Sequence, residues 1–335
     1  MRIRQRVLVT GAQGFVGRRL CAKLVEAGYS VRAAVRSVNG LHGAAQVEWF
    51  ETGDLGSFNA WSSLLEGVTT VIHLIARTHI TDEYGDSAIS EYRRTNVDLT
   101  RRLASAAVRA GTSRVIYMSS IKAVGNGSVE AYSESTPCRP EDSYGISKLE
   151  AERTLAETVR GSDCEYTILR PPLVYGVGVC GNFLRLLQLV RRGVPLPGVK
   201  NSRSMVHLEN LVDATIRCLH SDAARNELFH VADPEPISTG DLVRCMAHGQ
   251  GRTPLLVPLP RVFLAQLANV FGKGDEMKRL VGSLSVSSDK IGQRLGWMAK
   301  LTTEEGVVDV SRAFATNAWG HEPASDIGEG ARHAA

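Results

Sequence analysis

The sequence predicts an α/β fold in which helices cover both faces of a doubly wound parallel sheet, with a smaller lobe on the C-terminal side. Two observations predict it. Short β-branched runs alternate with amphipathic helical stretches through the first half of the chain, and this rhythm ends after Arg170-Pro171-Pro172, where prolines become frequent. We therefore expect one domain over residues 1–175, a second lobe over 176–318 and a flexible tail over 319–335.

The expected strands are the short runs richest in apolar and β-branched residues: 7–10, 30–36, 47–51, 70–74, 114–119 and 165–170. The expected helices between them include 14–27, 91–110 and 144–160. In the first helix Val16, Leu20 and Leu24 share one face, which is typical of a helix packed on a sheet. The fourth strand is apolar throughout, which indicates burial on both sides, and we expect its His73 to be a core residue.

Composition excludes several functional classes. The 39 Lys and Arg and the 35 Asp and Glu are spread along the chain, so the net charge of +4 forms no basic face for a nucleic acid. No apolar run reaches the roughly 18 residues that a membrane helix needs, and the start of the chain does not read as a signal peptide. The six cysteines lack the spacing of a metal site, so we expect reduced thiols, no metal and a cytoplasmic protein.

A glycine-rich loop follows the first strand. Gly11, Gly14 and Gly17 stand at a G-x-x-G-x-x-G spacing between that strand and the first helix. Gly11 permits a tight turn, Gly14 lets the backbone approach a diphosphate, and Gly17 lets the helix pack closely on the sheet. The free N–H groups of the helix would face the diphosphate. The pattern predicts a Rossmann-type dinucleotide site, with contacts expected from Gly11, Gln13, Gly14, Phe15, Val16 and Gly17.

The end of the second strand bears on the choice of cofactor. Enzymes that use NAD usually have an acid there for the ribose hydroxyls, and residues 29–37 contain no acid. Arg36 stands at the strand end, where a guanidinium can bind a 2′-phosphate. Arg32 lies about 13 Å back along the strand, at about 3.3 Å per residue, and is the weaker candidate. We predict NADP as the cofactor, with NAD as the alternative.

A tyrosine and a lysine open the helix expected over 144–160. Tyr144 and Lys148 are four residues apart and therefore share one face. A neighbouring ammonium lowers the high pKa of a tyrosine toward the working range, where the phenol can exchange a proton. Lys148 can also bond the nicotinamide ribose. Ser119 and Ser120 end the preceding strand, where a hydroxyl can hold the substrate oxygen.

These motifs together resemble the extended short-chain dehydrogenase/reductases, the NAD-dependent epimerase/dehydratase family, whose members act on nucleotide sugars. Counting back five residues from Gly125, as in that family's S-x-x-x-x-G segment, selects Ser120 over Ser119. The resemblance thus implies Ser120, Tyr144 and Lys148 as the catalytic set. It extends to about residue 315 and rests on the glycine loop, Gly53-Asp54-Leu55, His73-Leu74-Ile75-Ala76, Asn96, Ser119-Ser120, the Tyr144–Lys148 pair and Arg170-Pro171-Pro172.

The resemblance also implies the remaining contacts. Arg203 matches the family's diphosphate-binding arginine, and Asn182 matches the amide that lies against the nucleotide. We therefore expect the second lobe to bind a UDP-sugar, and we expect a family-like homodimer through the helices 91–110 and 144–160. The implied cofactor contacts are Asp54, Leu55, Leu74, Ile75, Ala76, Asn96, Tyr144, Lys148 and Pro171, and the implied substrate contacts are Ser119, Ser120, Asn182, Arg203 and Arg279.

Three chemistries are open to such a protein. The 4,6-dehydratases carry an Asp-Glu pair directly after the catalytic hydroxyl, and this chain has Ile121 and Lys122 there, so we do not expect dehydration. A 4-epimerase and a 4-ketoreductase share the remaining machinery. The epimerase holds its NAD tightly, whereas the reductase consumes NADPH in each turnover. Arg36 favours the reductase.

Further segments, 119–122, 170–176 and 282–284, resemble bacterial reductases of surface-polysaccharide synthesis, as for the O-antigen of lipopolysaccharide. Those enzymes convert a UDP-2-acetamido-2,6-dideoxy-4-hexulose to UDP-N-acetylquinovosamine or its 4-epimer, and we predict this activity. The alternative is an NAD-dependent 4-epimerase of UDP-hexoses or UDP-N-acetylhexosamines. Ser287 stands where that group has an acid, which leaves this contact open. Redox-sensing regulators and reductases of flavonoid or steroid ketones also stay open, although the latter should not need Arg203.

Overall fold

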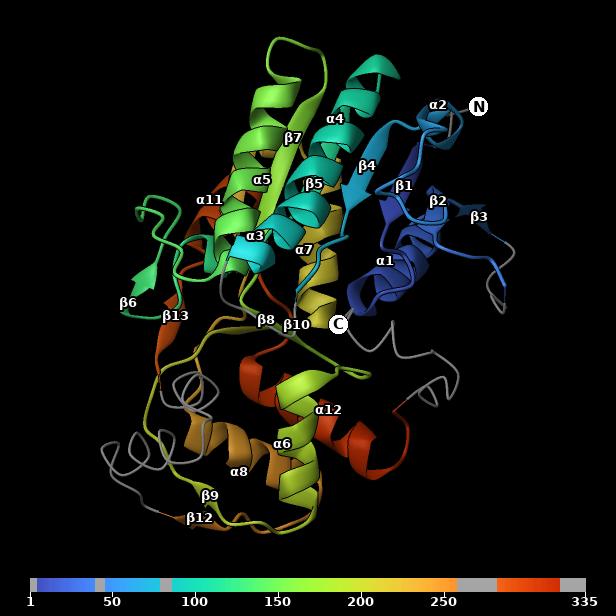
Figure 1. Cartoon of the computed structure of the whole chain (residues 1–335). Helices are drawn as coiled ribbons and strands as arrows, with labels where there is room; N and C mark the ends of the chain where they lie inside the picture. The colour runs from blue at the N-terminus through green and yellow to red at the C-terminus, as the bar shows by residue number, and fades with distance from the viewer. Residues whose placement is uncertain (1–4, 40–45, 79–85, 258–281, 320–335) are drawn as a thin grey trace.

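The computed structural model describes residues 5–39, 46–78, 86–257 and 282–319. A large α/β unit lies above a smaller lobe in the view of Figure 1, and each has a buried apolar core of its own. None of the described helices combines the length and the apolar character that crossing a membrane requires.

Seven parallel strands form the sheet of the large unit, in the order β11-β7-β5-β4-β1-β2-β3. The winding starts at β1 and runs outward in both directions, which confirms the predicted doubly wound fold. The six strands expected from the sequence are present to within one residue at each end. The strands are β1 (Arg6–Thr10), β2 (Ser30–Val35), β3 (Val47–Glu51), β4 (Thr70–His73), β5 (Arg114–Met118), β7 (Glu165–Arg170) and β11 (Glu227–His230).

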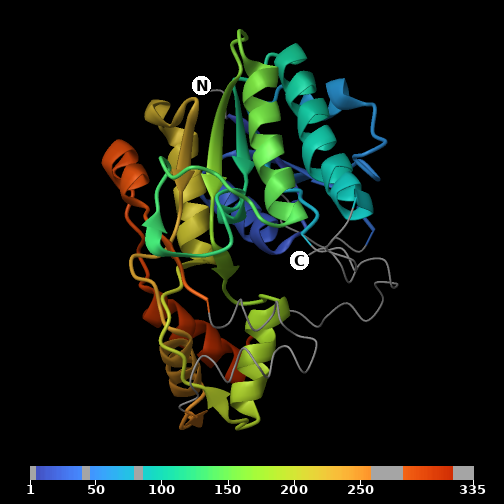
Figure 2. The same cartoon turned by 60° about the vertical axis from the view of Figure 1, so that its left-hand side comes forward.

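Helices cover both faces of the sheet (Figures 1 and 2). Alternate residues of β1 point to opposite faces, so Val7 and Val9 join one buried cluster and Leu8 joins the other. His73, the expected core histidine, is fully buried and bonds Thr10 through Nδ1 at 2.7 Å. The first face carries α1 (Phe15–Glu26) and α7 (Leu208–His220), and the second carries α2 (Trp61–Leu65), α4 (Leu99–Arg109) and α5 (Ser143–Val159).

The helix expected over 91–110 is divided into three parts. α3 (Asp86–Tyr92) runs into a π-helical segment, η1 (Arg93–Asp98), which continues as α4. A π-helical turn inserts an extra residue into the helix and occurs often at functional sites. Here it carries Asn96, which is completely buried. The pairing of two chains through α4 and α5 stays a prediction.

The smaller lobe packs three helices around its core: α6 (Gly181–Arg191), α8 (Thr239–Gly249) and α12 (Thr303–Ala315). The strands β9 (Leu196–Pro197) and β12 (Leu256–Val257) pair at its far end, away from the sheet (Figure 1). Two further parallel pairs lie between the unit and the lobe: β8 (Leu173–Tyr175) with β10 (Met205–His207), and β6 (Ser128–Tyr132) with β13 (Leu284–Val286). Two short 3₁₀ segments complete the described elements, η2 (Ile121–Ala123) and η3 (Asp222–Ala224).

The unit and the lobe are interleaved along the chain. β11 returns to the edge of the sheet beside β7, and α7 and α11 (Asp289–Leu295) pack against the same unit, although all three follow residue 175. Their apolar side chains, such as Phe229 and Ile291, complete the core beneath β1 and β2. The chain thus returns to the large unit after the boundary expected at residue 175, and that division into domains stays a prediction.

Candidate active site

The glycine loop joins the end of β1 to the first turn of α1. Gly11 has a φ of +73°, which favours glycine. A Cβ on Gly17 would overlap the carbonyl oxygen of Gly11, so the close approach of helix and loop requires glycine there. Gly14 is exposed and precedes α1, and no described side chain caps this helix end. The loop is therefore a cradle whose open N–H groups fit the diphosphate of a dinucleotide.

The other predicted loop contacts lie around this cradle. Gln13, Phe15 and Val16 are half-buried. Phe15 packs against the core of the sheet unit and also against the core of the lobe. The first helical residue after the cradle thus connects the two parts of the molecule.

Arg36 follows directly after β2, where the sequence places the cofactor-selecting residue. It is exposed, and its guanidinium pairs with none of the described residues. Arg32 is only 4% exposed, donates to backbone carbonyls near the end of α2 and pairs with Glu48 at 2.8 Å, so it is unavailable to a ligand. An acid does lie beside the strand end: Glu51, the last residue of β3, accepts a hydrogen bond from the N–H of Val38 at 2.9 Å.

Asp54 and Leu55 follow β3 on the same side of the sheet. Asp54 is exposed and accepts a hydrogen bond from the N–H of Gly56 at 2.9 Å, which shapes the turn. Leu55 is 6% exposed and packs in the core against α2 and α4. A ligand at this corner can therefore reach the Asp54 carboxylate, whereas the Leu55 side chain supports the turn from inside.

Asn96 clamps the segment that follows β4. Its oxygen accepts a hydrogen bond from the N–H of Arg77 at 2.8 Å, and its amide donates to the Arg77 carbonyl at 3.2 Å. The amide also donates to the Ser147 hydroxyl at 2.9 Å, and Ser147 donates to the Tyr144 carbonyl at 2.8 Å. Asn96 thus ties the half-buried residues 74–76, expected beside the nicotinamide, to the start of α5. Because Asn96 is completely buried, it supports the site by holding these two segments in place.

Ser120 and Tyr144 meet where β5 ends and α5 begins. The Ser120 Oγ accepts a hydrogen bond from the N–H of Lys122 at 3.3 Å. Burial raises the pKa of the Tyr144 phenol above its usual value, and the neighbouring Ser120 hydroxyl acts in the opposite direction. Pro171 lies at the neighbouring strand end, where its carbonyl accepts from the N–H of Ile121 at 2.9 Å.

Lys148 lies one turn further along α5. It is completely buried, donates to the carbonyl of Met118 at 2.7 Å, and its ammonium is 4.1 Å from the centre of the Tyr117 ring. Burial lowers the pKa of Lys148 to about 7, while the negative charge of Glu152 favours the charged form. A lysine whose pKa is lowered to near neutral pH is typical of a functional site.

Ser119 points away from this group into a buried ion pair. Its hydroxyl bonds to Glu152, which also accepts from Arg170 Nε at 2.9 Å and Nη2 at 2.5 Å. Glu152 and Arg170 are both 4% exposed. Ser119 uses its one donor proton here, which leaves Ser120 as the donor at the strand end. Sequence reasoning missed Glu152, although its position four residues after Lys148 on the buried face of α5 could have indicated it.

The lobe side of the site contains the predicted substrate contacts. Asn182 is exposed in the first turn of α6. Arg203 is half-buried, its backbone bridges to Ile237 and Leu284, and its Nη1 donates to the Gly282 carbonyl at 3.1 Å. Backbone pairing therefore fixes where Arg203 lies.

The remaining predicted positions are Arg279 and Ser287. Arg279 lies outside the described residues. Ser287, where related reductases would have an acid, donates to Asp289 at 2.8 Å and follows β13. It therefore shapes the start of α11.

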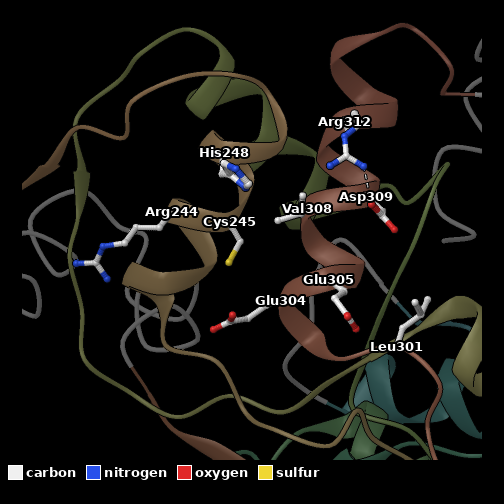
Figure 3. A pocket seen from close by; sticks show the side chains of 9 residues that line it. All are labelled: Arg244, Cys245, His248, Leu301, Glu304, Glu305, Val308, Asp309 and Arg312. Carbon is white, nitrogen blue, oxygen red and sulfur yellow. Dashed lines mark hydrogen bonds and ion pairs between the residues drawn. The ribbon is translucent and has the colours of Figure 1, made fainter.

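A separate hollow of about 610 Å³ lies on the lobe surface between α8 and α12 (Figure 3). Its lining combines cations such as Arg244 with acids such as Glu304, and Arg312 pairs there with Asp309 at 2.8 Å. None of the residues predicted for the active site lines this hollow. The chemically distinctive side chains gather instead at the carboxyl ends of β4, β5 and β7, where ligands bind in sheets of this kind.

Comparison with known proteins agrees with this location. Residues 7–232 match the profile of the family described as "NAD dependent epimerase/dehydratase family". The chain belongs to this family. A UDP-glucose 4-epimerase of Vibrio cholerae is 36% identical to it over 315 residues, which make up 92% of this chain and 95% of that protein. A 3 beta-hydroxysteroid dehydrogenase/Delta 5-->4-isomerase of Mycobacterium tuberculosis is 30% identical over 74% of this chain and 70% of its own length.

A solved structure shares the family fold over nearly the whole chain. MoeE5 in complex with UDP-glucuronic acid and NAD superposes with a TM-score of 0.75 at 27% identity, covering 92% of this chain and 99% of its own. The family assignment confirms the resemblance to the NAD-dependent epimerase/dehydratase family, the extended short-chain dehydrogenase/reductases, that the motifs indicated. The narrower resemblance to 4-ketoreductases stays a prediction.

Proposed function

We propose that this enzyme catalyses hydride transfer at C4 of a UDP-sugar, with Ser120, Tyr144 and Lys148 as its catalytic residues. The observation that supports this most strongly is that the Ser120 hydroxyl lies beside the Tyr144 phenol at a strand end, one helical turn from a fully buried Lys148 whose pKa burial lowers to about 7. A hydroxyl, a phenol and an ammonium in this arrangement can hold a carbonyl oxygen and exchange a proton with it.

The cradle of Gly11, Gly14 and Gly17 would hold the dinucleotide diphosphate, and residues 74–76 would border the nicotinamide. When bound, the dinucleotide supplies or accepts the hydride. The chain's own part is proton transfer and orientation. Tyr144 gives its proton to the C4 oxygen in reduction and takes it back in oxidation, and Ser120 holds that oxygen. The positive charge of Lys148 stabilises the phenolate that Tyr144 becomes.

The lobe would hold the nucleotide end of the substrate. Arg203 would bind the diphosphate through charge-assisted hydrogen bonds, and the exposed amide of Asn182 would contact the nucleotide. MoeE5, the structural neighbour described above, has a UDP-sugar bound.

Dehydration does not fit the residues that follow Ser120. Ile121 is 2% exposed and belongs to a small apolar cluster with Val124 and Leu284. Lys122 is paired with Asp142 at 2.6 Å. Neither residue can serve as the acid or base that 4,6-dehydration needs at these positions.

We propose further that the net reaction is reduction of a 4-keto sugar by NADPH, as on a UDP-2-acetamido-2,6-dideoxy-4-hexulose for surface-polysaccharide synthesis. This direction is supported by Arg36, an exposed cation directly after β2, where no acid of that strand opposes a 2′-phosphate.

The second candidate is an NAD-dependent 4-epimerase of UDP-hexoses. It is favoured by the name of the relative at 36% identity and by the NAD in the MoeE5 complex. Both candidates use the same catalytic side chains, and they differ in whether the cofactor is consumed.

One experiment separates the candidates. The purified protein is assayed with a UDP-4-keto-6-deoxy sugar and NADPH or NADH, and in parallel with UDP-glucose and UDP-N-acetylglucosamine without added cofactor, and the products are assigned by NMR. We expect NADPH oxidation and a 4-hydroxy product. Release of NAD from the denatured protein, together with hexose interconversion and no NADPH oxidation, would establish the epimerase instead. Absence of UDP binding would overturn both candidates in favour of a different ketone substrate.

A further inference from the structure

An ion pair that the catalytic assignment does not use lies beside Tyr144. Lys122 Nζ and Asp142 Oδ2 are 2.6 Å apart, and the ammonium is 5.7 Å from the centre of the Tyr144 ring. The Lys122 side chain is 31% exposed and the Asp142 side chain 12% exposed. The pair is thus shielded enough for its charges to act on a neighbouring phenol.

Both members of the pair also take part in hydrogen bonds that involve backbone N–H groups close to Ser120 and Tyr144. Lys122 follows Ser120 in η2 and donates its N–H to the Ser120 Oγ at 3.3 Å. Asp142 is the N-cap of α5 and accepts from the N–H of Gly145 at 2.7 Å, one residue after Tyr144. The ion pair therefore connects the segment that carries Ser120 to the helix that carries Tyr144.

The 3₁₀ segment η2 and the first turn of α5 pack tightly against each other. A Cβ on Gly145 would overlap the carbonyl oxygen of Lys122, so helix and 3₁₀ segment are in direct backbone contact there. A small displacement of Lys122 would be passed on to Tyr144. Close contact of this kind keeps reacting groups within the narrow tolerance that catalysis needs.

The charged and titratable groups around the phenol come from four elements among the described residues. Asp142 and Lys148 come from α5 and its cap, Lys122 from η2, Tyr117 from β5 and Tyr92 from α3. After burial itself, the carboxylate of Asp142 is the strongest of the influences that raise the pKa of Tyr144, and Tyr92 adds to it. Lys122 is the cation in contact with that carboxylate. The ammonium of Lys122 therefore opposes the effect of the Asp142 carboxylate on the phenol, and loss of either member would leave the charge of the other without its partner.

We propose that the Lys122–Asp142 ion pair is a positioning device that holds Ser120 and Tyr144 together and balances the charge beside the Tyr144 phenol. This rests on the proposed function, in which Tyr144 exchanges the proton. Lys122 and Asp142 act through Tyr144 and Ser120. They are positioning residues, and removing either charge alone should change the acidity of Tyr144, in opposite directions for the two variants.

The test is the pH dependence of kcat for the reduction in Lys122→Met, Asp142→Asn and the double variant. In the reductive direction Tyr144 must be protonated and Lys148 must carry its charge, so activity falls at alkaline pH as this coupled pair loses its first proton. Lys122→Met leaves the carboxylate uncompensated and should move this alkaline limb to higher pH. Asp142→Asn keeps a residue that caps the helix, leaves the ammonium uncompensated and should move the limb to lower pH. Each displacement should be on the order of one pH unit.

The double variant and two further variants serve as controls. The double variant has no charge left to unbalance, so its limb should return close to that of the wild type. Lys122→Arg keeps the cation and should keep the limb. Lys300→Met breaks a surface ion pair with Asp213, 2.5 Å long and remote from the predicted site residues, and should leave the profile unchanged. The thermal midpoint of each variant shows that it is folded.

These experiments distinguish failure of the ion-pair proposal from failure of the proposed function. If Tyr144→Phe keeps full activity, the catalytic assignment itself is wrong. If Tyr144→Phe is inactive while the alkaline limb of kcat in Lys122→Met and Asp142→Asn lies at the same pH as in the wild type, the ion pair does not act on the phenol. Equal losses of kcat without displacement, and no recovery in the double variant, would show a merely structural contact and overturn the proposal.

Discussion

The residues predicted for the site at the carboxyl ends of the sheet and those predicted in the lobe are held in place by different means. At the sheet, the polar side chains are buried and partnered: Asn96 and Lys148 are completely inaccessible, and Glu152 and Arg170 are each 4% exposed. In the lobe, Asn182 is exposed and Arg203 is half-buried and held through its backbone. In the proposed complex, the reacting end of the substrate meets a rigid, preorganised surface, and its nucleotide end meets the exposed amide of Asn182 and an arginine whose place is set by backbone pairing.

The largest expected effect tests the rigidity of the sheet end. In Glu152→Gln the buried guanidinium of Arg170 loses its counter-charge, which typically costs about 3–5 kcal/mol of unfolding free energy. Urea unfolding measures this loss. The matched control is Glu26→Gln in the surface pair with Lys23, which should leave the urea midpoint unchanged. Equal midpoints for Glu152→Gln and the wild type would show that the buried pair does not hold the strand ends.

The next effect is catalytic. Tyr144→Phe removes one hydroxyl without changing shape, so fold and cofactor binding should persist while kcat falls by at least about a hundredfold, the usual scale of acid–base help. Tyr92→Phe is the matched control, because its ring centre lies 6.0 Å from that of Tyr144. It should keep turnover close to that of the wild type. Near-normal turnover in Tyr144→Phe would remove the phenol from the mechanism.

The same contrast explains what the sequence could predict. Gly11, Gly14 and Gly17 form their cradle through local geometry, so spacing alone locates the loop. Tyr144 and Lys148 share a helix face through their four-residue spacing. Six strands of the sheet could be predicted because each is a short run rich in apolar, aromatic or β-branched residues.

What the sequence could not predict depends on contacts between distant segments. β11 reads Glu227-Leu228-Phe229-His230, too polar to predict a buried strand, and it becomes one by pairing with β7. The partners of Asn96 and Glu152 lie 19 and 18 residues away in sequence, at Arg77 and Arg170. Such partners follow from the winding of the sheet, which local patterns do not encode.

The lobe offers the next prediction, with a smaller effect. Arg203→Ala should weaken binding of UDP about ten- to a hundredfold, because a charge-assisted hydrogen bond contributes roughly 1.5–3 kcal/mol. Binding of NADP should not change. Titration calorimetry with UDP measures this, and Arg192→Ala, an exposed arginine just after α6, is the control that should bind UDP normally. Unchanged UDP affinity in Arg203→Ala would place the diphosphate elsewhere in the lobe.

The smallest predicted effect concerns Arg36, which is part of the sheet unit but is exposed like Asn182 of the lobe. The 2′-phosphate of NADP carries nearly two negative charges, and the exposed guanidinium can pair with it. Glu51 lies at the neighbouring strand end, but its carboxylate accepts from the N–H of Val38. Arg36→Asp replaces the cation by an anion, so kcat/KM for NADPH should fall at least about tenfold while that for NADH is kept or rises. The same charge reversal at Arg160, exposed at the far end of α5, should leave the ratio of the two cofactors unchanged. If Arg36→Asp also leaves that ratio unchanged, the end of β2 does not select the cofactor, and the argument for a reductase over an NAD-dependent epimerase loses its main support.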